Sequence, residues 1–216
     1  MSAKYPRTPH LPWSPGGTKD DRRVESVDSF IGRELIITEK VDGSNLCMTR
    51  SNVFARSHGA APGHISFDYA KGLHAGLSHT IDNGVSLFGE YCYAVHSIAY
   101  TKIDGYFLLF GARDDTINKW YSWDDVELQA MDSCVLTVPV LWRGMVDSAE
   151  QLEERTNSLC EDASYFGGDR EGVVVRLADS FADEDFSKSV AKWVRANHVQ
   201  TDDHWKSRTV VRQRVG

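Results

Sequence analysis

The apolar residues of this chain fall into short runs, and this pattern limits the possible folds more than any other feature. Glycine, proline and polar residues separate the runs. None of the runs approaches the roughly 20 residues that a membrane-spanning helix needs. Short runs rich in β-branched and aromatic residues are typical of strands. The sequence therefore predicts an α+β fold, in which short strands form mostly antiparallel sheets and a few helices lie between them.

Strand-like segments recur along most of the chain. They lie at residues 35–40, 45–50, 85–91, 106–110, 135–146 (with a break at Pro139), 172–177 and 191–196. Apolar residues at helical spacing predict helices at 66–78, 123–131 and 148–160. Ser122 is placed to cap the second helix. An Asp-Gly pair predicts a tight hairpin turn between the first two strands, which would leave Lys40 at a strand end.

The length of 216 residues suits one domain with a modest extension. Clustered prolines and glycines predict an irregular arm at residues 1–29. We expect the domain at residues 30–197 and a basic tail at 198–216. From residue 188 onward there are seven basic residues and two acidic ones. This excess makes the tail a candidate contact for a polynucleotide backbone, although a solvated terminus explains the charge equally well. The candidate contacts are Lys206, Arg208, Arg212 and Arg214.

The charge and the cysteines exclude several classes of protein. The chain has 24 Lys and Arg against 31 Asp and Glu, a net charge of −7. A protein that binds nucleic acid through bulk charge is therefore excluded, and any such contact must be local. The four cysteines are far apart and form no CxxC pair, which argues against a disulfide framework or a zinc ribbon. We expect reduced thiols in a cytoplasmic protein, with no membrane contact and no oligomer.

The segment Glu39-Lys40-Val41-Asp42-Gly43 is the first candidate for chemistry. A lysine fixed between a strand and a turn, beside carboxylates, suits a nucleophilic amine. An ordinary lysine has a pKa of about 10.4, so we expect the site to lower the pKa of Lys40. The string alone is weak evidence, because an ordinary surface hairpin has the same composition.

Further segments follow in a fixed order, and together they are hard to attribute to chance. They are Phe88-Gly89-Glu90, Tyr106-Phe107-Leu108-Leu109-Phe110-Gly111-Ala112, Glu171-Gly172-Val173-Val174-Val175-Arg176 and Ala191-Lys192-Trp193-Val194-Arg195. With the lysine segment they resemble motifs I, III, IIIa, IV and V of the covalent nucleotidyltransferases, which are the polynucleotide ligases and mRNA capping enzymes. The resemblance spans residues 34–196. The residues within the motifs at 39–40, 88–91 and 192–195 resemble those of ATP-dependent RNA ligases more than those of DNA ligases.

The resemblance implies a set of catalytic residues. Lys40 would attack the α-phosphate of ATP and become lysyl-AMP. Asp42 would position the lysine or a metal-bound water. Lys192 would contact the α-phosphate, and Glu171 would face Mg²⁺. Glu171 and Glu90 would share the metal, because the sequence contains no separate cage of acidic ligands.

The resemblance also implies residues that bind the nucleotide. Glu90 would bind the ribose hydroxyls, and Phe110 would stack on adenine, with Phe107 as the alternative. Arg56 falls where the family places a basic residue near the reacting phosphate, although a surface arginine is an open alternative. The full nucleotide-binding set is Glu39, Lys40, Asn45, Arg56, Glu90, Phe110, Glu171 and Lys192.

Two departures from the family pattern are visible. The family often has a second lysine two residues from the first in motif V, but Val190 and Val194 flank Lys192 at that spacing. The second cation is therefore missing or is Arg195. Too few residues follow motif V for the OB-fold that capping enzymes carry. We expect an ATP-dependent RNA ligase that joins 5′-phosphate and 3′-hydroxyl RNA ends; the alternatives are a DNA ligase and a non-catalytic RNA-end-binding repair subunit.

Overall fold

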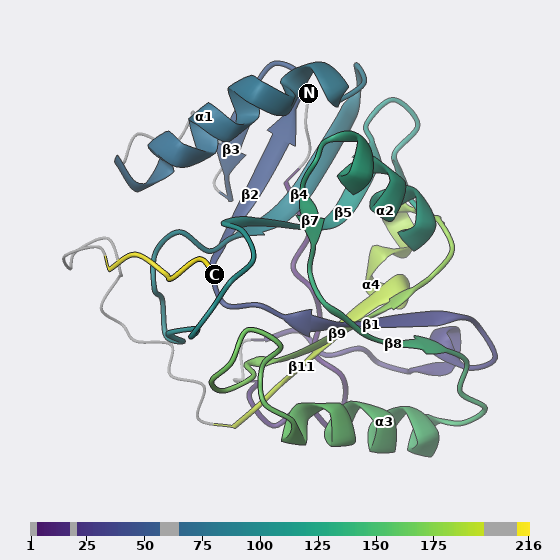
Figure 1. The fold of residues 1–216 in the computed structure, drawn as a ribbon. Helices are drawn as coiled ribbons and strands as arrows, with labels where there is room; N and C mark the ends of the chain where they lie inside the picture. Colours follow the sequence, from purple (N-terminus) through teal and green to yellow (C-terminus); the bar gives the residue numbers. More distant parts are fainter. Residues whose placement is uncertain (1–3, 18–20, 57–64, 197–210) are drawn as a thin grey trace.

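The computed structural model describes residues 4–17, 21–56, 65–196 and 211–216. In this part of the chain two β-sheets lie one above the other, and helices flank them (Figure 1). All strand pairings but one are antiparallel in the described residues, the exception being β5 with β7. The predicted α+β fold with mostly antiparallel sheets is confirmed, and the described residues contain no OB-fold.

The larger sheet has the strand order β10-β6-β5-β4-β2-β3, with β7 paired to β5. Its strands are β2 (Ser44–Thr49), β3 (Val53–Ala55), β4 (Val85–Tyr91), β5 (Phe107–Asp114), β6 (Lys119–Trp120), β7 (Leu136–Thr137) and β10 (Phe181–Ala182). The β2–β4 register places Asn45 opposite Glu90, so strand pairing alone brings these two polar side chains together.

The smaller sheet has the order β11-β9-β1-β8. Its strands are β1 (Leu35–Lys40), β8 (Val140–Gly144), β9 (Gly172–Leu177) and β11 (Val190–Val194). The β1–β9 register pairs Lys40 with Gly172, and Lys192 of β11 lies opposite Val174. Residues from three distant parts of the sequence are thereby set on adjacent strands.

The α-helices are α1 (Asp68–Leu77), α2 (Trp123–Asp132), α3 (Ala149–Glu161) and the short α4 (Phe186–Ser189). Helices α1 and α2 lie against the larger sheet and α3 against the smaller one, whereas α4 lies between the two sheets (Figure 1). The hydroxyl oxygen of Ser122 accepts a hydrogen bond from the Asp125 amide at 3.1 Å, as an N-cap does. The predicted helices at 66–78, 123–131 and 148–160 are therefore present with small shifts at their ends.

The predicted hairpin between the first two strands is wrong. β1 belongs to the smaller sheet and β2 to the larger one, so residues 41–43 cross from one sheet to the other. Gly43 does not have a positive φ. It is needed for space, since a Cβ there would lie 2.8 Å from the carbonyl oxygen of Tyr91. Glycine is thus needed at residue 43 because the chain passes close to Tyr91, and not because it forms a tight turn.

The ends of the described chain pack against the domain. The arm reaches its interior, where Leu11 and Phe30 are fully buried. Residues 211–216 lie along the segment that joins β4 to β5, with Ala94 opposite Arg212 and Ile103 opposite Val215. Among the described helices, none has the length and apolar character needed to cross a membrane.

Candidate active site

A cavity of about 400 Å³ lies between the two sheets. Its walls come from both sheets and from the N-terminal arm. All residues of the predicted nucleotide-binding set line it: Glu39, Lys40, Asn45, Arg56, Glu90, Phe110, Glu171 and Lys192. Residues predicted from six separate places in the sequence are thus brought together by the fold.

Lys40 and Glu171 form an ion pair in this cavity. The Lys40 Nζ lies 2.5 Å from Oε1 of Glu171, and the Glu171 side chain is only 6% exposed. Burial lowers the pKa of Lys40, but the carboxylates of Glu171 and Glu90 outweigh it and raise that pKa above its ordinary value. The expectation that the site lowers the pKa of Lys40 is therefore not met in the ligand-free protein, because the lysine is held as an ammonium ion by its neighbours.

Glu90 and Asn45 form the opposite wall, on neighbouring strands of the larger sheet. Burial raises the pKa of Glu90 to about 8, although the charge of Lys40 opposes this shift. The Oδ1 atom of Asn45 is buried and has no hydrogen-bond partner among the described residues. A buried acceptor without a partner is costly, so it suits a site whose ligand supplies the missing donor.

Lys192 faces the same cavity from β11. Burial lowers its pKa, and the nearby charge of Lys40 lowers it further. Arg56 lies just beyond β3, is exposed, and lines the cavity at its edge. The cavity therefore combines three carboxylates with four Lys and Arg side chains, an arrangement that suits an anionic ligand bound with a divalent cation.

Asp42 and Glu39 hold neighbouring loops. One oxygen of Asp42 accepts three hydrogen bonds of 2.8–2.9 Å, from the amide and hydroxyl of Ser97 and the amide of Ile98. Asp42 does not line the cavity. The buried carboxylate of Glu39 accepts hydrogen bonds from the Ser164 hydroxyl and the Tyr165 amide. In this ligand-free arrangement both carboxylates fix the backbone that surrounds Lys40.

Aromatic residues close the other end of the cavity. The Tyr5 ring packs edge-on against Phe110, with centroids 4.9 Å apart, and also contacts Trp120 and Phe186. Phe107, the alternative adenine partner, is buried in the core and is not part of the cavity wall. Phe110 is therefore the residue of the two that an entering ligand can contact.

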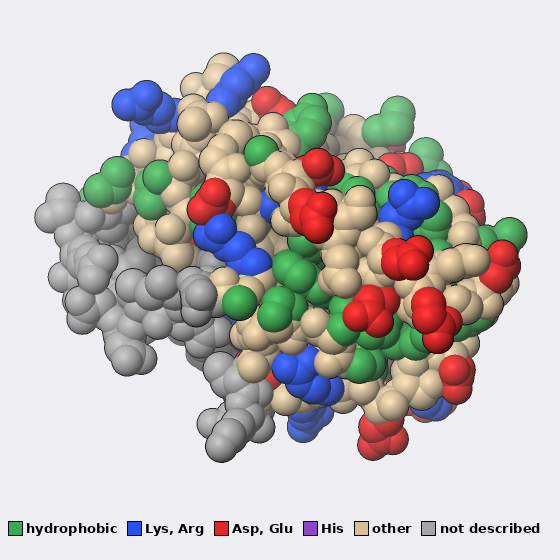
Figure 2. Space-filling view, turned by 90° about the horizontal axis from the view of Figure 1, so that it is seen from below, with side chains coloured by type: hydrophobic (Ala, Val, Ile, Leu, Met, Phe, Trp, Pro, Cys, Tyr) green, Lys and Arg blue, Asp and Glu red, His purple; other side chains and the backbone are tan. Residues whose placement is uncertain are grey.

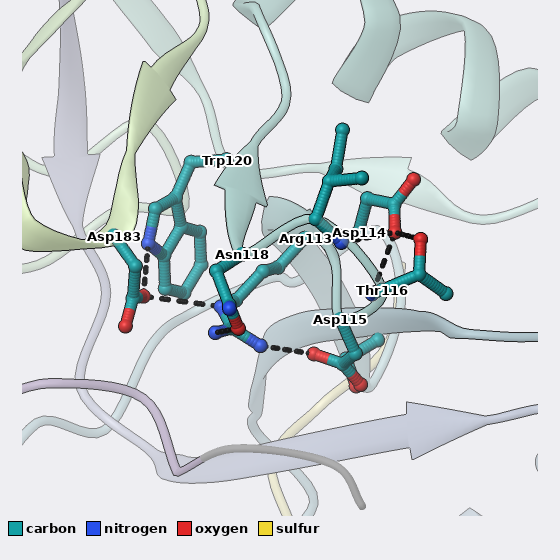
Figure 3. Close-up of polar contacts among 9 residues, drawn as sticks. Arg113, Asp114, Asp115, Thr116, Asn118, Trp120 and Asp183 are labelled. Carbon is teal, nitrogen blue, oxygen red and sulfur yellow. Dashed lines mark hydrogen bonds and ion pairs between the residues drawn. The ribbon is translucent and has the colours of Figure 1, made fainter.

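A polar network fixes this aromatic wall from behind (Figure 3). Buried Arg113 donates to Asp183 at 3.0 Å and to Asn118 at 2.7 Å, and it is ion-paired with Asp115. The Trp120 indole donates to the same Asp183 at 2.8 Å. The network ties the turn after β5 to the segment before α4, and so sets Trp120 against its aromatic neighbours.

Of the predicted polynucleotide contacts, the structure describes Arg212 and Arg214, whereas Lys206 and Arg208 lie outside the described residues. Both arginines are exposed. The Arg212 Nε donates to the Tyr106 hydroxyl at 2.5 Å, and its guanidinium lies over the Tyr93 ring. Neither arginine lines the cavity.

Sequence reasoning missed several residues of the cavity wall, among them Tyr5, His10 and Arg176. The first two lie on the arm, which has no periodic pattern that marks it as part of a site. Buried Arg176 donates to the carbonyls of Phe110 and Tyr121 at 3.4 and 2.7 Å. The sequence indicated Arg176 only through its position on β9. It lies two residues after Val174, and residues at this spacing in a strand face the same side, here the cavity.

Two sheets around a cavity with a buried lysine–carboxylate pair define a nucleotide-binding domain of the kind predicted above. The RNA ligase family model matches residues 33–194, which is most of the chain. The chain belongs to the RNA ligase family. A comparison with curated proteins found no match.

Solved structures of the Naegleria gruberi RNA ligase share the fold. A variant with ATP and manganese has a TM-score of 0.61 at 18% identity, over 88% of this chain and 60% of that ligase. A second variant with ATP and manganese has a TM-score of 0.60 at 20% identity, over 83% and 56%. The same ligase with pyrophosphate has a TM-score of 0.59 at 18% identity, over 90% and 61%. The chain thus spans about three-fifths of the length of these ligases.

Proposed function

We propose that this protein is an ATP-dependent RNA ligase that joins 5′-phosphate and 3′-hydroxyl RNA ends through lysyl-AMP. The observation that carries the proposal is the Lys40–Glu171 pair at 2.5 Å, inside a cavity that also contains Glu90 and Lys192. Membership of the RNA ligase family and the fold shared with ligases bound to ATP and to pyrophosphate support it.

The first step is the attack of Lys40 on ATP. Its Nζ forms a bond with the α-phosphorus, the bond from that phosphorus to the bridging oxygen breaks, and pyrophosphate leaves. Lys40 must first lose a proton, and Glu171 is the carboxylate in contact with its Nζ. Lys192 neutralises charge on the phosphates as the leaving group departs. Glu90 and Asn45 bind the ribose side, and Phe110 stacks on adenine.

The residues fit a divalent cation as a further component. The described residues contain no group of three His, Cys, Asp or Glu that would hold a metal by themselves. Mg²⁺ needs no such cage, because it usually binds one or two carboxylates together with substrate phosphates and water. Glu171 and Glu90 supply two carboxylates on opposite walls of the cavity. When bound there, the cation would neutralise phosphate charge and favour the neutral form of Lys40.

Covalent labelling tests the proposal directly. The protein is incubated with α-labelled ATP and Mg²⁺ and separated under denaturing conditions. Wild type should carry the label, and Lys40→Ala should lose it completely, because the nucleophile is absent. Lys40→Arg should also be unlabelled, since arginine stays protonated at usable pH.

Lys71→Ala is the matched control, because Lys71 lies on α1, pairs with Asp68 and does not line the cavity. This variant should label like wild type. Labelling of Lys40→Ala at the wild-type level would contradict the proposal. Sealing assays with nicked RNA and nicked DNA of the same sequence distinguish an RNA ligase from a DNA ligase. A protein that becomes labelled but seals neither substrate would favour an RNA-end-binding subunit.

We further propose a monomeric, cytoplasmic protein that acts in RNA repair, built from an arm (1–29), an adenylation domain (30–197) and a basic tail (198–216). Its four cysteines are free thiols, two of them buried, which supports a reducing compartment. Light scattering after size-exclusion chromatography tests the oligomeric state.

A further inference from the structure

The N-terminal arm runs beside β11, the edge strand of the smaller sheet, and an isolated parallel bridge joins His10 to Lys192. The Lys192 amide donates to the Pro9 carbonyl at 2.9 Å, and the Leu11 amide donates to the Lys192 carbonyl at 2.8 Å. The next contact along β11 is made by Gly16, where a Cβ would lie 2.4 Å from the Arg195 carbonyl oxygen. The arm is therefore fitted closely to β11 by backbone pairing.

This pairing turns His10 toward the cavity. His10 is bridged in parallel with Lys192, and residues paired in this way carry their side chains on the same face of a sheet. Alternate arm residues Pro6, Thr8 and His10 all line the cavity, as expected for an extended strand with one face turned inward. His10 and Lys192 therefore lie side by side at the charged end of the cavity.

Ser14 lies against the Nδ1 side of the His10 ring. Its Oγ accepts from the Val194 amide at 2.9 Å and lies 2.9 Å from Nδ1 of His10, whereas the Val194 carbonyl is 3.5 Å away. The hydroxyl proton is best placed on the shorter contact, toward Nδ1. We assign the ring proton to Nε2 on this basis, which makes Nε2 a donor. The nearest carboxylate oxygen to Nε2, on Asp21, is 3.7 Å away and too far for a hydrogen bond.

The surroundings of His10 keep the ring neutral in the absence of ligand. Burial lowers its pKa to about 4, the positive charges of Lys192, Arg23 and Lys40 act in the same direction, and only Asp21 opposes them. A buried donor among three cations is poorly suited to a cationic or neutral ligand. It is well suited to an anion.

We propose that His10 donates a hydrogen bond from Nε2 to the phosphate chain of ATP beyond the α-phosphate. This inference rests on the proposed function, in which Lys40 attacks the α-phosphate. The order of strands is β1, β9, β11 and then the arm, so His10 lies one strand beyond Lys192, or about 5 Å further from the nucleophile's strand. The arm thereby supplies a second phosphate-binding side chain beside Lys192, where β11 itself has Val194.

Two substitutions separate a ligand contact from a structural role. His10→Asn keeps a polar atom near the position of Nδ1, which contacts Ser14, but removes the group at Nε2. His10→Gln places an amide donor near the position of Nε2. The probes are α,β-methylene-ATP, which cannot transfer its adenylyl group, and AMP, which lacks the phosphates beyond α. Dissociation constants for both are measured by calorimetry with Mg²⁺ on the full-length protein.

We expect His10→Asn to weaken α,β-methylene-ATP binding about 10-fold or more, the effect of losing one hydrogen bond to a charged group. AMP binding should stay within about twofold, and His10→Gln should bind both probes nearly as wild type does. Equal α,β-methylene-ATP affinity in wild type and His10→Asn would overturn the inference, as would equal weakening of both probes by His10→Asn. If wild type bound neither probe and gave no Lys40 label, the proposed function would fail, and this inference with it.

Discussion

Glu39 and Glu171 both lie close to Lys40, yet they have different tasks. Glu171 contacts the lysine amine in the cavity, at 2.5 Å. Glu39 is turned toward the loop that precedes β9, where it accepts hydrogen bonds from Ser164 and the Tyr165 amide. The guanidinium of Arg170 lies 3.5 Å from it, and both side chains are almost fully buried. Successive side chains of a strand point to opposite sides, so on β1 the Lys40 amine reaches Glu171 while the neighbouring Glu39 carboxylate reaches the loop.

Glu39→Ala should lower the free energy of unfolding by about 3 kcal/mol or more, because Arg170 would be left buried without its carboxylate. Urea unfolding monitored by tryptophan fluorescence measures the change. Glu34→Ala is the control, since Glu34 forms a more exposed ion pair with Arg143 and its loss should change stability far less than the loss of Glu39. Unchanged stability of Glu39→Ala with loss of AMP labelling would instead assign Glu39 to the nucleotide.

At the scale of elements, two glycines show how differently strand and helix positions respond to the same change. Gly172→Ala should destabilise the protein by about 1–3 kcal/mol, because overpacking forces the backbone to move. A Cβ there would lie 2.0 Å from the Trp193 carbonyl oxygen, between β9 and β11. It should also reduce labelling, since Gly172 pairs with Lys40 and follows Glu171.

Gly72→Ala is the matched substitution within α1, where an added Cβ has no heavy atom within 4 Å. It should stabilise the protein by about 0.5–1 kcal/mol, because alanine favours the helix. The two variants are compared by thermal unfolding and by AMP labelling. A Gly172→Ala variant as stable as Gly72→Ala would show that β9 and β11 are not packed as described.

The sequence was sufficient to predict the longer elements and most of the charged residues of the cavity. Alternation and capping are local signals, so β4, β9 and the Ser122 cap could be predicted from neighbouring residues alone. The hairpin at Asp42-Gly43 failed because sheet membership depends on pairing with distant strands. Lys40, Glu90, Glu171 and Lys192 were predicted through motif order. The role of the arm was not, because its backbone pairing is with β11, which is distant in the sequence.

The whole molecule is acidic, and its charge is unevenly distributed. Acidic side chains spread over much of the face seen from below, on the α3 side, with smaller groups of basic ones between them (Figure 2). The RNA substrate proposed above would be repelled by the acidic part of this face. We propose that Lys206, Arg208, Arg212 and Arg214 bind the RNA backbone; exposed Arg212 and Arg214, outside the cavity, support this proposal.

Replacing these four residues with alanine should weaken RNA binding almost equally for all sequences, because phosphate contacts carry no base information. The slope of log affinity against log salt should become less steep by up to about four contacts. Fluorescence anisotropy at several salt concentrations measures both. AMP labelling of Lys40 should be unchanged. Lost labelling with unchanged RNA affinity would assign the tail to ATP instead of RNA.

The pairing of the arm with β11 has a consequence for how the protein is made. Residue 10 leaves the ribosome long before its partner at residue 192. Until then Leu11, which is fully buried in the finished protein, has no strand to cover it. A nascent or truncated chain that ends before β11 therefore cannot complete the cavity. The arm stays uncovered until β11 has been made, and during that interval its apolar residues are exposed to other proteins.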